Sequence, residues 1–278
     1  MTDRVAFQGV FGAYSHLACM ELYPNADYLP CQTFDAAFSA VQQGTADFAV
    51  IPIENSNAGR VTDVHFLLSK TPLHIIGEHF LRIEHQLIGL PNAEFNDIKK
   101  AISHPQALSQ CSTFLQTNKI TPEAQSDTAL SCKILTETQD KSVAAIASSA
   151  AAKIYNLKIL ASNIENAANN TTRFLVMSRE KITPVYDGKK FITSLIFKAK
   201  NIPAALYKAL GGFATNNINV TKLESYLLNG KFVSAQFYME VEAHPETAAF
   251  KNAMSELKFF SEDNLILGTY PAHDYRYQ

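Results

Sequence analysis

Four short clusters of polar residues in this chain have the types and spacing to do chemistry. Each lies where a predicted apolar strand begins or ends: 12–16 (GAYSH), 54–56 (ENS), 103–106 (SHPQ) and 169–174 (NNTTRF). A strand that enters a helix through a glycine turn leaves free N–H groups beside the positive end of the helix dipole, which favours an anion. Arg173 could bind a carboxylate through two hydrogen bonds, or form a structural ion pair instead. These residue types point to the binding of a small anion.

Each cluster by itself is also compatible with a structural role. Ser15 would then lie near a helix cap, Glu54 and Asn55 would cap the next turn, and His104 would be a core or capping histidine. Ligands of open α/β sheets bind outside the carboxyl ends of the strands. Because all four clusters lie at strand ends, which converge on one cleft in a two-lobed protein, we expect them to form one site.

The sequence lacks the signatures of most other chemistries. We find no nucleophile elbow, phosphate-binding loop, dinucleotide fingerprint or HExxH zinc motif. The eight histidines are dispersed, and none stands at zinc-finger spacing from Cys19, Cys31, Cys111 or Cys132. We therefore expect no metal and no cofactor, and four reduced, mostly buried thiols.

Composition narrows the function classes further. A length of 278 residues predicts about two domains. The net charge of −2 excludes the broad basic surface that nucleic-acid binding needs. No apolar run approaches the ~18 residues of a membrane helix, and the N-terminal residues lack a signal-peptide pattern. We expect a soluble, cytoplasmic protein.

The elements that must position the clusters alternate between strand and helix over the first 180 residues, which predicts an α/β fold with parallel sheets. Phe48–Ile53 is apolar nearly throughout, as is typical of a parallel strand buried on both faces. One helix is expected from Pro105 to about Gln116. Because 180 residues is generous for one sheet, we expect two lobes, with the chain crossing near Leu73–Leu90 and returning near Ile159–Met177.

The C-terminal part follows a linker at 179–190 that carries four basic residues, Pro184 and Gly188. Its predicted order is βαββαβ, the ferredoxin-like motif. Asn229-Gly230 is a strong signal for the hairpin between the two middle strands. The expected elements are strand Phe191–Phe197, helix Pro203–Thr215, strand Ile218–Leu227, strand Phe232–Val241, helix Pro245–Leu257 and strand Phe260–Leu267.

At these clusters the sequence resembles the prephenate dehydratase family, and residues 221–225 (TKLES) resemble the amino-acid-binding ACT domain. The resemblance covers nearly the whole chain in order and spacing. It implies an α/β fold: a two-lobed catalytic domain like type II periplasmic binding proteins, then an α+β ferredoxin-like ACT domain. The implied catalytic domain is 1–182, with lobes at about 1–75 plus 160–182 and at 76–159. Residues 183–190 are the linker and 191–278 the ACT domain.

The resemblance implies that the chain converts prephenate to phenylpyruvate in L-phenylalanine biosynthesis. Prephenate loses its ring hydroxyl and one carboxylate, and because aromatisation drives the reaction no cofactor is needed. Thr172 would be catalytic, hydrogen-bonding the leaving hydroxyl. His104 would be a scaffold residue. The implied substrate-binding residues are Ser15, Glu54, Asn55, Ser56, Gln106, Arg173 and Phe174.

The C-terminal domain departs from its family pattern at two places. Ala204 stands where the usual Pro-Gly-Ala-Leu loop has glycine, and Tyr226-Leu227 replaces the usual Arg-Pro. We still expect L-phenylalanine to inhibit the enzyme by binding between paired ACT domains of a homodimer or homotetramer. The implied effector residues are Pro203, Ala204, Ala205, Leu206, Asn219, Glu224 and Ser225.

Two alternatives remain open. Arogenate carries an amine in place of the keto group of prephenate, and the same contacts would serve an arogenate dehydratase. A non-catalytic amino-acid sensor would combine a binding-protein cleft with an ACT domain. The 172–174 (TRF) and 54–55 (EN) motifs argue against a sensor, which needs no threonine at that place.

Overall fold

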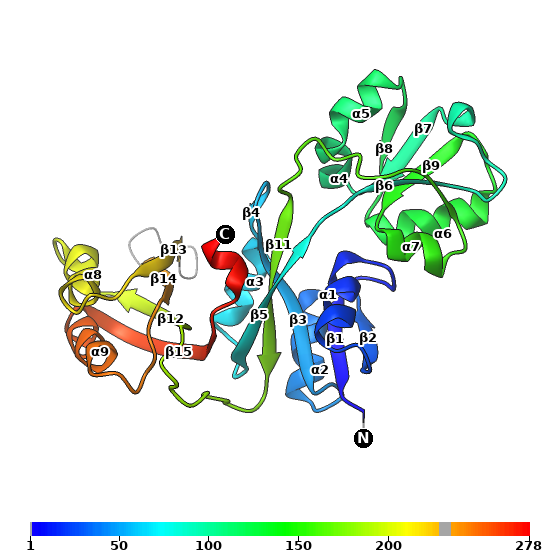
Figure 1. Cartoon of the computed structure of the whole chain (residues 1–278). Coiled ribbons are helices and arrows are strands. Elements are labelled where there is room, and N and C mark those ends of the chain that lie inside the picture. The colour runs from blue at the N-terminus through cyan, green and yellow to red at the C-terminus, as the bar shows by residue number, and fades with distance from the viewer. Residues whose placement is uncertain (1, 228–234) are drawn as a thin grey trace. The chain divides into compact units, whose positions relative to one another are not determined.

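The structure is a computed structural model that describes residues 2–227 and 235–278 (Figure 1). The chain divides into two compact units, Met1–Val64 with His79–Phe174, and His65–Glu78 with Leu175–Gln278. Within the described residues the strands form three sheets. The domain boundaries expected at 182 and 191 stay a prediction.

The first sheet has the strand order β2-β1-β3-β11-β5, with β4 paired to β3. Strand β1 is parallel to both β2 and β3. Val50, Ile51 and Ile53 of β3 are fully buried, as expected of a parallel strand covered on both faces. The bounds are β1 Arg4–Gln8, α1 Tyr14–Leu22, β2 Asp27–Cys31, α2 Phe34–Gln42, β3 Phe48–Asn55, β4 Gly59–Arg60, α3 Thr62–Leu68, β5 His74–Arg82 and β11 Thr171–Ser178.

The second sheet has the order β10-β6-β9-β7-β8. The prediction of a single helix from Pro105 to Gln116 is wrong. Two helices meet at Cys111, whose φ of −109° and ψ of 13° lie outside the helical region. Neither glycine nor proline marks this break in the sequence. The bounds are β6 Gln86–Gly89, η1 Phe95–Asp97, β7 Lys100–Ser103, α4 Pro105–Gln110, α5 Ser112–Thr117, β8 Thr121–Ala124, α6 Thr128–Thr138, β9 Val143–Ala147, α7 Ser149–Ile154 and β10 Lys158–Ala161.

The chain crosses between these two sheets where the sequence predicted. It leaves the first sheet at Arg82 and enters the second at Gln86, and it returns between Ala161 and Thr171. The α/β class and the two-lobed arrangement are therefore confirmed. Both crossing segments carry polar residues that reappear in the site below.

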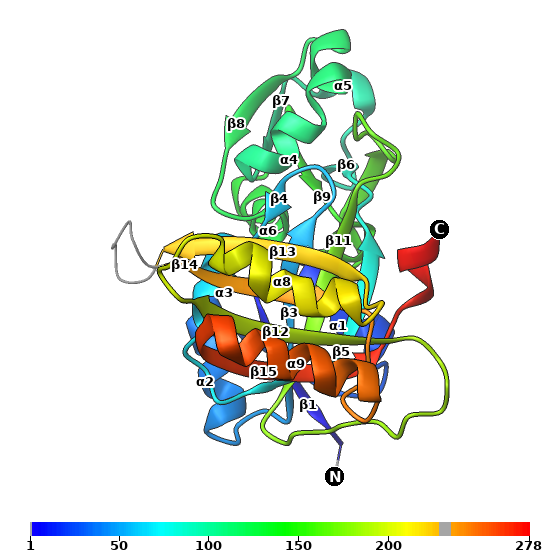
Figure 2. The same ribbon diagram turned by 90° about the vertical axis from the view of Figure 1, so that its left-hand side faces the viewer.

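The third sheet is antiparallel with the order β13-β14-β12-β15. Figure 2 shows helices α8 and α9 lying over one face of it. Phe197, Phe213 and Leu257 are fully buried in the core between them. The predicted βαββαβ order is confirmed, while the expected Asn229-Gly230 turn lies outside the described residues. The bounds are β12 Phe191–Ala199, α8 Ala205–Thr215, β13 Val220–Leu227, β14 Ala235–Val241, α9 Ala248–Phe260, β15 Ser261–Pro271 and η2 Asp274–Tyr277.

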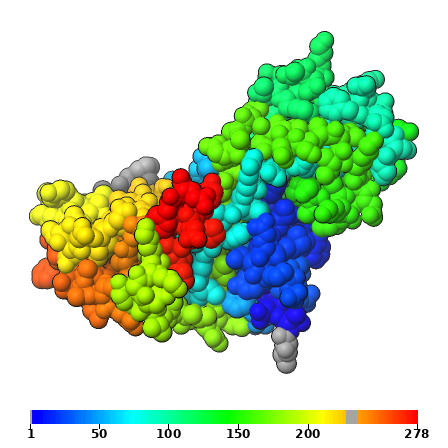
Figure 3. Space-filling model, viewed as in Figure 1, coloured from blue at the N-terminus to red at the C-terminus, as the bar shows by residue number. Residues whose placement is uncertain are grey.

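The C-terminal segment is held by an ion cluster. Figure 3 shows this segment, in red, on the surface of the molecule. Arg276 donates two hydrogen bonds of 2.7 Å to the carboxylate of Glu78 and one of 2.8 Å to Glu240. Both carboxylate side chains are fully buried, whereas that of Arg276 is 12% exposed. The cluster joins η2 to β5 and β14.

Two other sequence expectations concern cysteines and membranes. All four cysteines are free and buried, as expected. Burial raises the pKa of the Cys111 and Cys132 thiols to about 12, so they are protonated at neutral pH. Among the helices that the structure describes, none is long and apolar enough to cross a membrane.

Candidate active site

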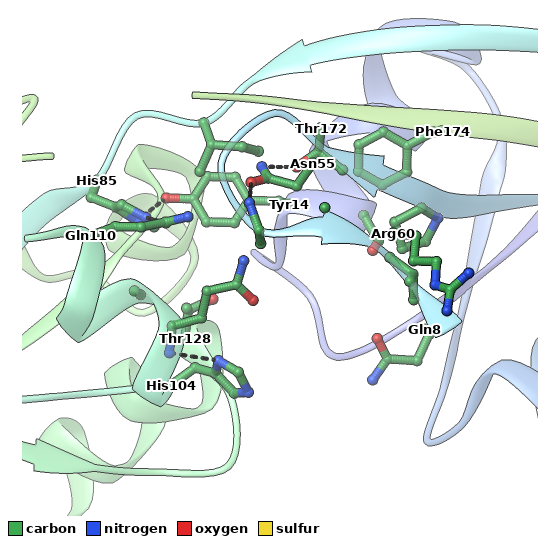
Figure 4. Close-up of a pocket in the computed structure, with 18 of the residues that line it drawn as sticks. Gln8, Tyr14, Asn55, Arg60, His85, His104, Gln110, Thr128, Thr172 and Phe174 are labelled. Atoms are coloured by element: carbon green, nitrogen blue, oxygen red, sulfur yellow. Dashed lines mark hydrogen bonds between the residues drawn. The ribbon is translucent and has the colours of Figure 1, made fainter. Parts of the chain in front are cut away.

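A cavity of about 490 Å³ in the first unit brings residues of the first two sheets together (Figure 4). Five of the site residues expected from the sequence line it: Ser15, Asn55, Gln106, Thr172 and Phe174. His104 also lines it. The remaining lining residues are Gln8, Tyr14, Phe34, Pro52, Ala58, Gly59, Arg60, Val61, Ile83, His85, Ala107, Gln110 and Thr128.

Thr172 and Asn55 form the centre of the site. Thr172 lies near the start of β11, and Asn55 is the last residue of β3, which neighbours β11 in the sheet. Asn55 Nδ2 donates to Thr172 Oγ1 at 2.9 Å. Asn55 Oδ1 accepts from the backbone N–H groups of Asn57 and Ala58, at 3.0 and 2.9 Å. The amide of Asn55 is thus held at both ends and its N–H faces the threonine.

Arg173, expected to bind a carboxylate of the substrate, is engaged in an ion pair within the protein. Its side chain is 3% exposed, lies outside the cavity lining, and donates to Glu54 Oε1 at 2.9 Å. The structural ion pair considered for Arg173 is the arrangement found. Arg173 lies between Thr172 and Phe174 on β11. Because successive side chains of a strand point to opposite faces, it points away from the face that carries those two residues.

Glu54 and Ser56 are also outside the cavity lining. Ser56 Oγ donates to the Asn169 carbonyl at 2.9 Å and accepts from Thr171 N at 3.0 Å. With the Glu54 ion pair, these bonds join the end of β3 to the start of β11. A substrate contact for Glu54 or Ser56 stays a prediction.

The SHPQ and GAYSH clusters position their segments through backbone bonds. His104 is the N-cap of α4, and its Nδ1 accepts from Gln106 N at 3.2 Å, so the capping role expected for His104 is found. Gly12 has φ +89°, and a Cβ there would lie 2.8 Å from Ala151 Cα. Ser148 Oγ donates to the Gly12 carbonyl at 2.6 Å. Glycine is needed at 12 because α7 packs directly on this turn.

Arg60 is the only residue with a formal charge among the described residues that line the cavity. It lies on β4, and the hairpin pairs it with Glu54. Burial lowers the pKa of the His85 imidazole and raises that of the Tyr14 hydroxyl, so both are neutral at neutral pH. An otherwise neutral wall with one guanidinium suits an anionic ligand.

Sequence reasoning missed several of these lining residues. Tyr14 lies inside the 12–16 cluster and Arg60 lies shortly after the 54–56 cluster, so their nearness in sequence to these clusters was a usable signal. His85 and Gln110 had no local signal, because only the crossing of the chain brings them to the cavity. Within the described residues no group of three or more histidine, cysteine, aspartate or glutamate side chains could hold a metal ion.

Fold and site together define a two-lobed α/β protein with a ferredoxin-like C-terminal part and a cavity lined by residues of both lobes. The chain belongs to the prephenate dehydratase family of hydro-lyases: the family model described as "Prephenate dehydratase" matches residues 5–182.

Relatives and a solved structure agree with this assignment. The chain is 46% identical to the bifunctional N-acyl-homoserine lactone acylase/prephenate dehydratase of Komagataeibacter europaeus, over 98% of this chain and 97% of that protein. It is 41% identical to arogenate dehydratase 2 of Petunia hybrida, over 97% of this chain and 72% of that protein. The prephenate dehydratase of Arthrobacter aurescens in complex with L-Phe has a TM-score of 0.90 at 28% identity, covering 98% of this chain and 90% of that one.

Proposed function

We propose that this chain is a prephenate dehydratase that forms phenylpyruvate. The observation that carries the proposal is the position of Thr172, which Asn55 holds on the wall of the cavity. Among the described residues that line this cavity, Arg60 is the one with a formal charge. In the reaction the electrons of the ring C–CO2 bond enter the ring as CO2 departs, and the ring hydroxide leaves. The hydroxide takes up one proton and departs as water.

The cavity wall suits both departures. Thr172 Oγ1 accepts the Asn55 N–H, so its own proton is available for the leaving hydroxyl. A threonine hydroxyl is too weak an acid to protonate hydroxide alone, and we assign it to hydrogen-bonding and relaying the proton. The apolar side chains Phe34, Val61, Ile83 and Phe174 would exclude water from the ring carboxylate and favour its loss as CO2.

A direct assay tests the proposal. Purified protein is mixed with prephenate at neutral pH and phenylpyruvate is followed, beside a no-enzyme control and a parallel series with arogenate. None of the described lining residues is a carboxylate, the partner that the ammonium group of arogenate would need, which favours prephenate. Turnover of arogenate alone would give the arogenate dehydratase alternative. Binding without turnover of either compound would leave the sensor.

We assign one carboxylate of prephenate to Arg60 in place of Arg173. Arg60→Gln is expected to raise KM for prephenate by about tenfold with kcat changed less than about threefold, because one charge-assisted hydrogen bond contributes about 1.5–3 kcal/mol. Steady-state kinetics measures this, and Arg4→Gln, an exposed arginine outside the cavity, is the control. An unchanged KM in Arg60→Gln would remove Arg60 from the substrate contacts.

We further propose that L-phenylalanine inhibits the enzyme through the C-terminal domain. Three of the expected effector residues, Ala204, Ala205 and Leu206, line a cavity of about 290 Å³ with Ile202 and Phe237. The L-Phe complex of the Arthrobacter relative supports a phenylalanine effector. The other expected effector residues do not line this cavity: Pro203, Asn219, Glu224 and Ser225.

Two of those residues have partners within their own domain. Asn219 Nδ2 donates to Glu242 at 3.0 Å, and Glu224 pairs with Lys222 at 3.5 Å. A role for Asn219 and Glu224 would therefore need the second ACT domain of a homodimer or homotetramer, whose paired surfaces complete the site. Size-exclusion chromatography with light scattering, with and without phenylalanine, measures that assembly.

Ala204 limits the effector response. It has φ 60° and ψ 21°, the left-handed region, which costs an L-residue about 1–2 kcal/mol, and it lines the 290 Å³ cavity. Ala204→Gly is expected to lower the phenylalanine concentration for half-inhibition by about threefold to tenfold, with kcat unchanged without effector. Ala205→Gly, the next cavity residue but helical, is the matched control. Equal shifts in the two variants would contradict this role.

A further inference from the structure

The hydrogen bonds of Thr172 continue through three side-chain amides to a histidine and a tyrosine. Asn55 Nδ2 donates to Asn170 Oδ1 at 2.8 Å as well as to Thr172. Asn170 Nδ2 donates to Gln110 Oε1 at 3.2 Å, and His85 Nε2 lies 2.8 Å from the same oxygen. Beyond it, the Tyr14 hydroxyl lies 2.8 Å from His85 Nδ1. Figure 4 shows Tyr14, His85 and Gln110 grouped on one side of the cavity.

The direction of every bond in this chain follows from two backbone groups. The N–H groups of Asn57 and Ala58 can only donate, so the atom of Asn55 that faces them is its carbonyl oxygen. The other end of the amide is then the NH2 group, which donates to Thr172 Oγ1, to Asn170 Oδ1 and, at 3.3 Å, to the Thr171 carbonyl. The orientation of Asn55 is fixed by protein geometry and does not depend on a choice between equivalent amide flips.

The same logic passes outward from Asn55. Because Asn170 accepts from Asn55 with its oxygen, its NH2 group faces Gln110. Gln110 must present its oxygen, and His85 must donate to that oxygen from Nε2. In the neutral imidazole Nδ1 is then an acceptor for the Tyr14 hydroxyl, which shares its proton between this nitrogen at 2.8 Å and the Glu84 carbonyl at 2.9 Å. Asn170 and His85 are 1% and 2% exposed, so a reversed bond at either would leave a buried polar atom unpaired.

We propose that this one-way chain of hydrogen bonds makes Thr172 a donor toward the substrate, with Asn170 as a positioning residue that holds the Asn55 amide in plane. If the Asn55 amide turned over, its oxygen would take the Thr172 proton away from the leaving hydroxyl. Asn170 is held on its other side by Gln110, the last residue of α4, which accepts its N–H. Gln110 in turn is held by His85 from the crossing segment. The positioning role rests on the proposed function, whereas the bond directions do not.

The bond directions are tested without any assay of activity. In the uniformly ¹⁵N-labelled wild-type protein at about pH 8, above the ordinary histidine pKa of about 6.5, long-range ¹H–¹⁵N NMR reports which ring nitrogen of His85 carries the proton. Loss of the signal in His85→Gln assigns it. We expect the proton on Nε2. A proton on Nδ1 would mean that the chain runs the other way and would overturn the inference.

Two variants at one position test the positioning role. Asn170→Asp keeps an oxygen that accepts from Asn55, whether or not the new carboxyl is ionised, and Asn170→Ala removes it. We expect kcat of Asn170→Ala to fall about tenfold with KM within about twofold, and kcat of Asn170→Asp to stay within about threefold. Equal losses of kcat in the two variants, or full kcat in Asn170→Ala, would overturn the role.

The outcomes separate this inference from the proposed function. A wild-type protein that converts neither prephenate nor arogenate contradicts the function, while the His85 measurement still decides the bond directions. Thermal melting of Asn170→Ala identifies a variant that has merely unfolded. In that case the kinetics of Asn170→Asp, together with the NMR result, carry the test.

Discussion

Thr172→Ala is expected to lower kcat for prephenate by about 100-fold or more, the largest effect on activity that we predict. The alanine removes the hydroxyl that faces the cavity and leaves Asn55 Nδ2 without one of its three acceptors. Among the described residues of β11 that line the cavity, Thr172 alone carries a hydroxyl. Because Thr172 makes no ion pair and is half-buried, the fold should persist and KM should change little.

Conservative variants separate the hydroxyl from the shape of Thr172. Thr172→Ser keeps the hydroxyl and should retain activity within about tenfold, whereas Thr172→Val keeps the shape and should behave like alanine. Steady-state kinetics with prephenate measures all three variants. Wild-type turnover in Thr172→Ala would refute the catalytic role, and so would equal losses in the serine and valine variants.

Arg276→Met is expected to lower the free energy of unfolding by about 3–5 kcal/mol, the largest effect on stability that we predict. Arg276 pairs with two carboxylates, Glu78 and Glu240, whose side chains have no exposed surface. Once the guanidinium is gone, the His273 N–H still donates to Glu78 and the Tyr238 hydroxyl to Glu240, but both buried carboxylates have lost this cation. Urea unfolding followed by circular dichroism measures the loss.

Two controls show whether burial causes the effect. Arg4 pairs with Asp27 at 3.2 Å, but both side chains are exposed, so Arg4→Met should cost less than about 1 kcal/mol. Combining Arg276→Met with Glu78→Gln and Glu240→Gln removes the charges and should restore most of the stability. If Arg276→Met cost no more than Arg4→Met, the cluster would not hold the C-terminal segment.

Much of the fold was predictable because the signals that specify it are local. The apolar run at Phe48–Ile53 predicts a doubly covered strand from its own residues alone, and β3 has that burial. The βαββαβ order of the C-terminal part likewise follows from periodicity within each element. The break at Cys111 was not predictable, because the sequence there is ordinary for a helix and carries no glycine or proline.

The candidate site was partly predictable for a related reason. Ser15, Asn55, Gln106, Thr172 and Phe174 lie at strand ends or helix starts, and a parallel sheet brings such ends to one edge whatever the details of packing. Their motifs were also sufficient to indicate the family. Their roles in binding and catalysis stay predictions until the variants are measured.

The sequence by itself determined most of the strand and helix order, the family and which clusters contribute residues to one cavity, because each depends on residue types within a few positions of one another. Only the tertiary structure decided what the polar side chains bind. Arg173 pairs with Glu54, 119 positions away, and Asn55 meets Asn170 and Thr172 at separations of 115 and 117. Strand pairing and the crossing between sheets create these contacts. Local patterns therefore could not distinguish the buried arginine from Arg60, or reveal the chain of bonds from Thr172 to His85.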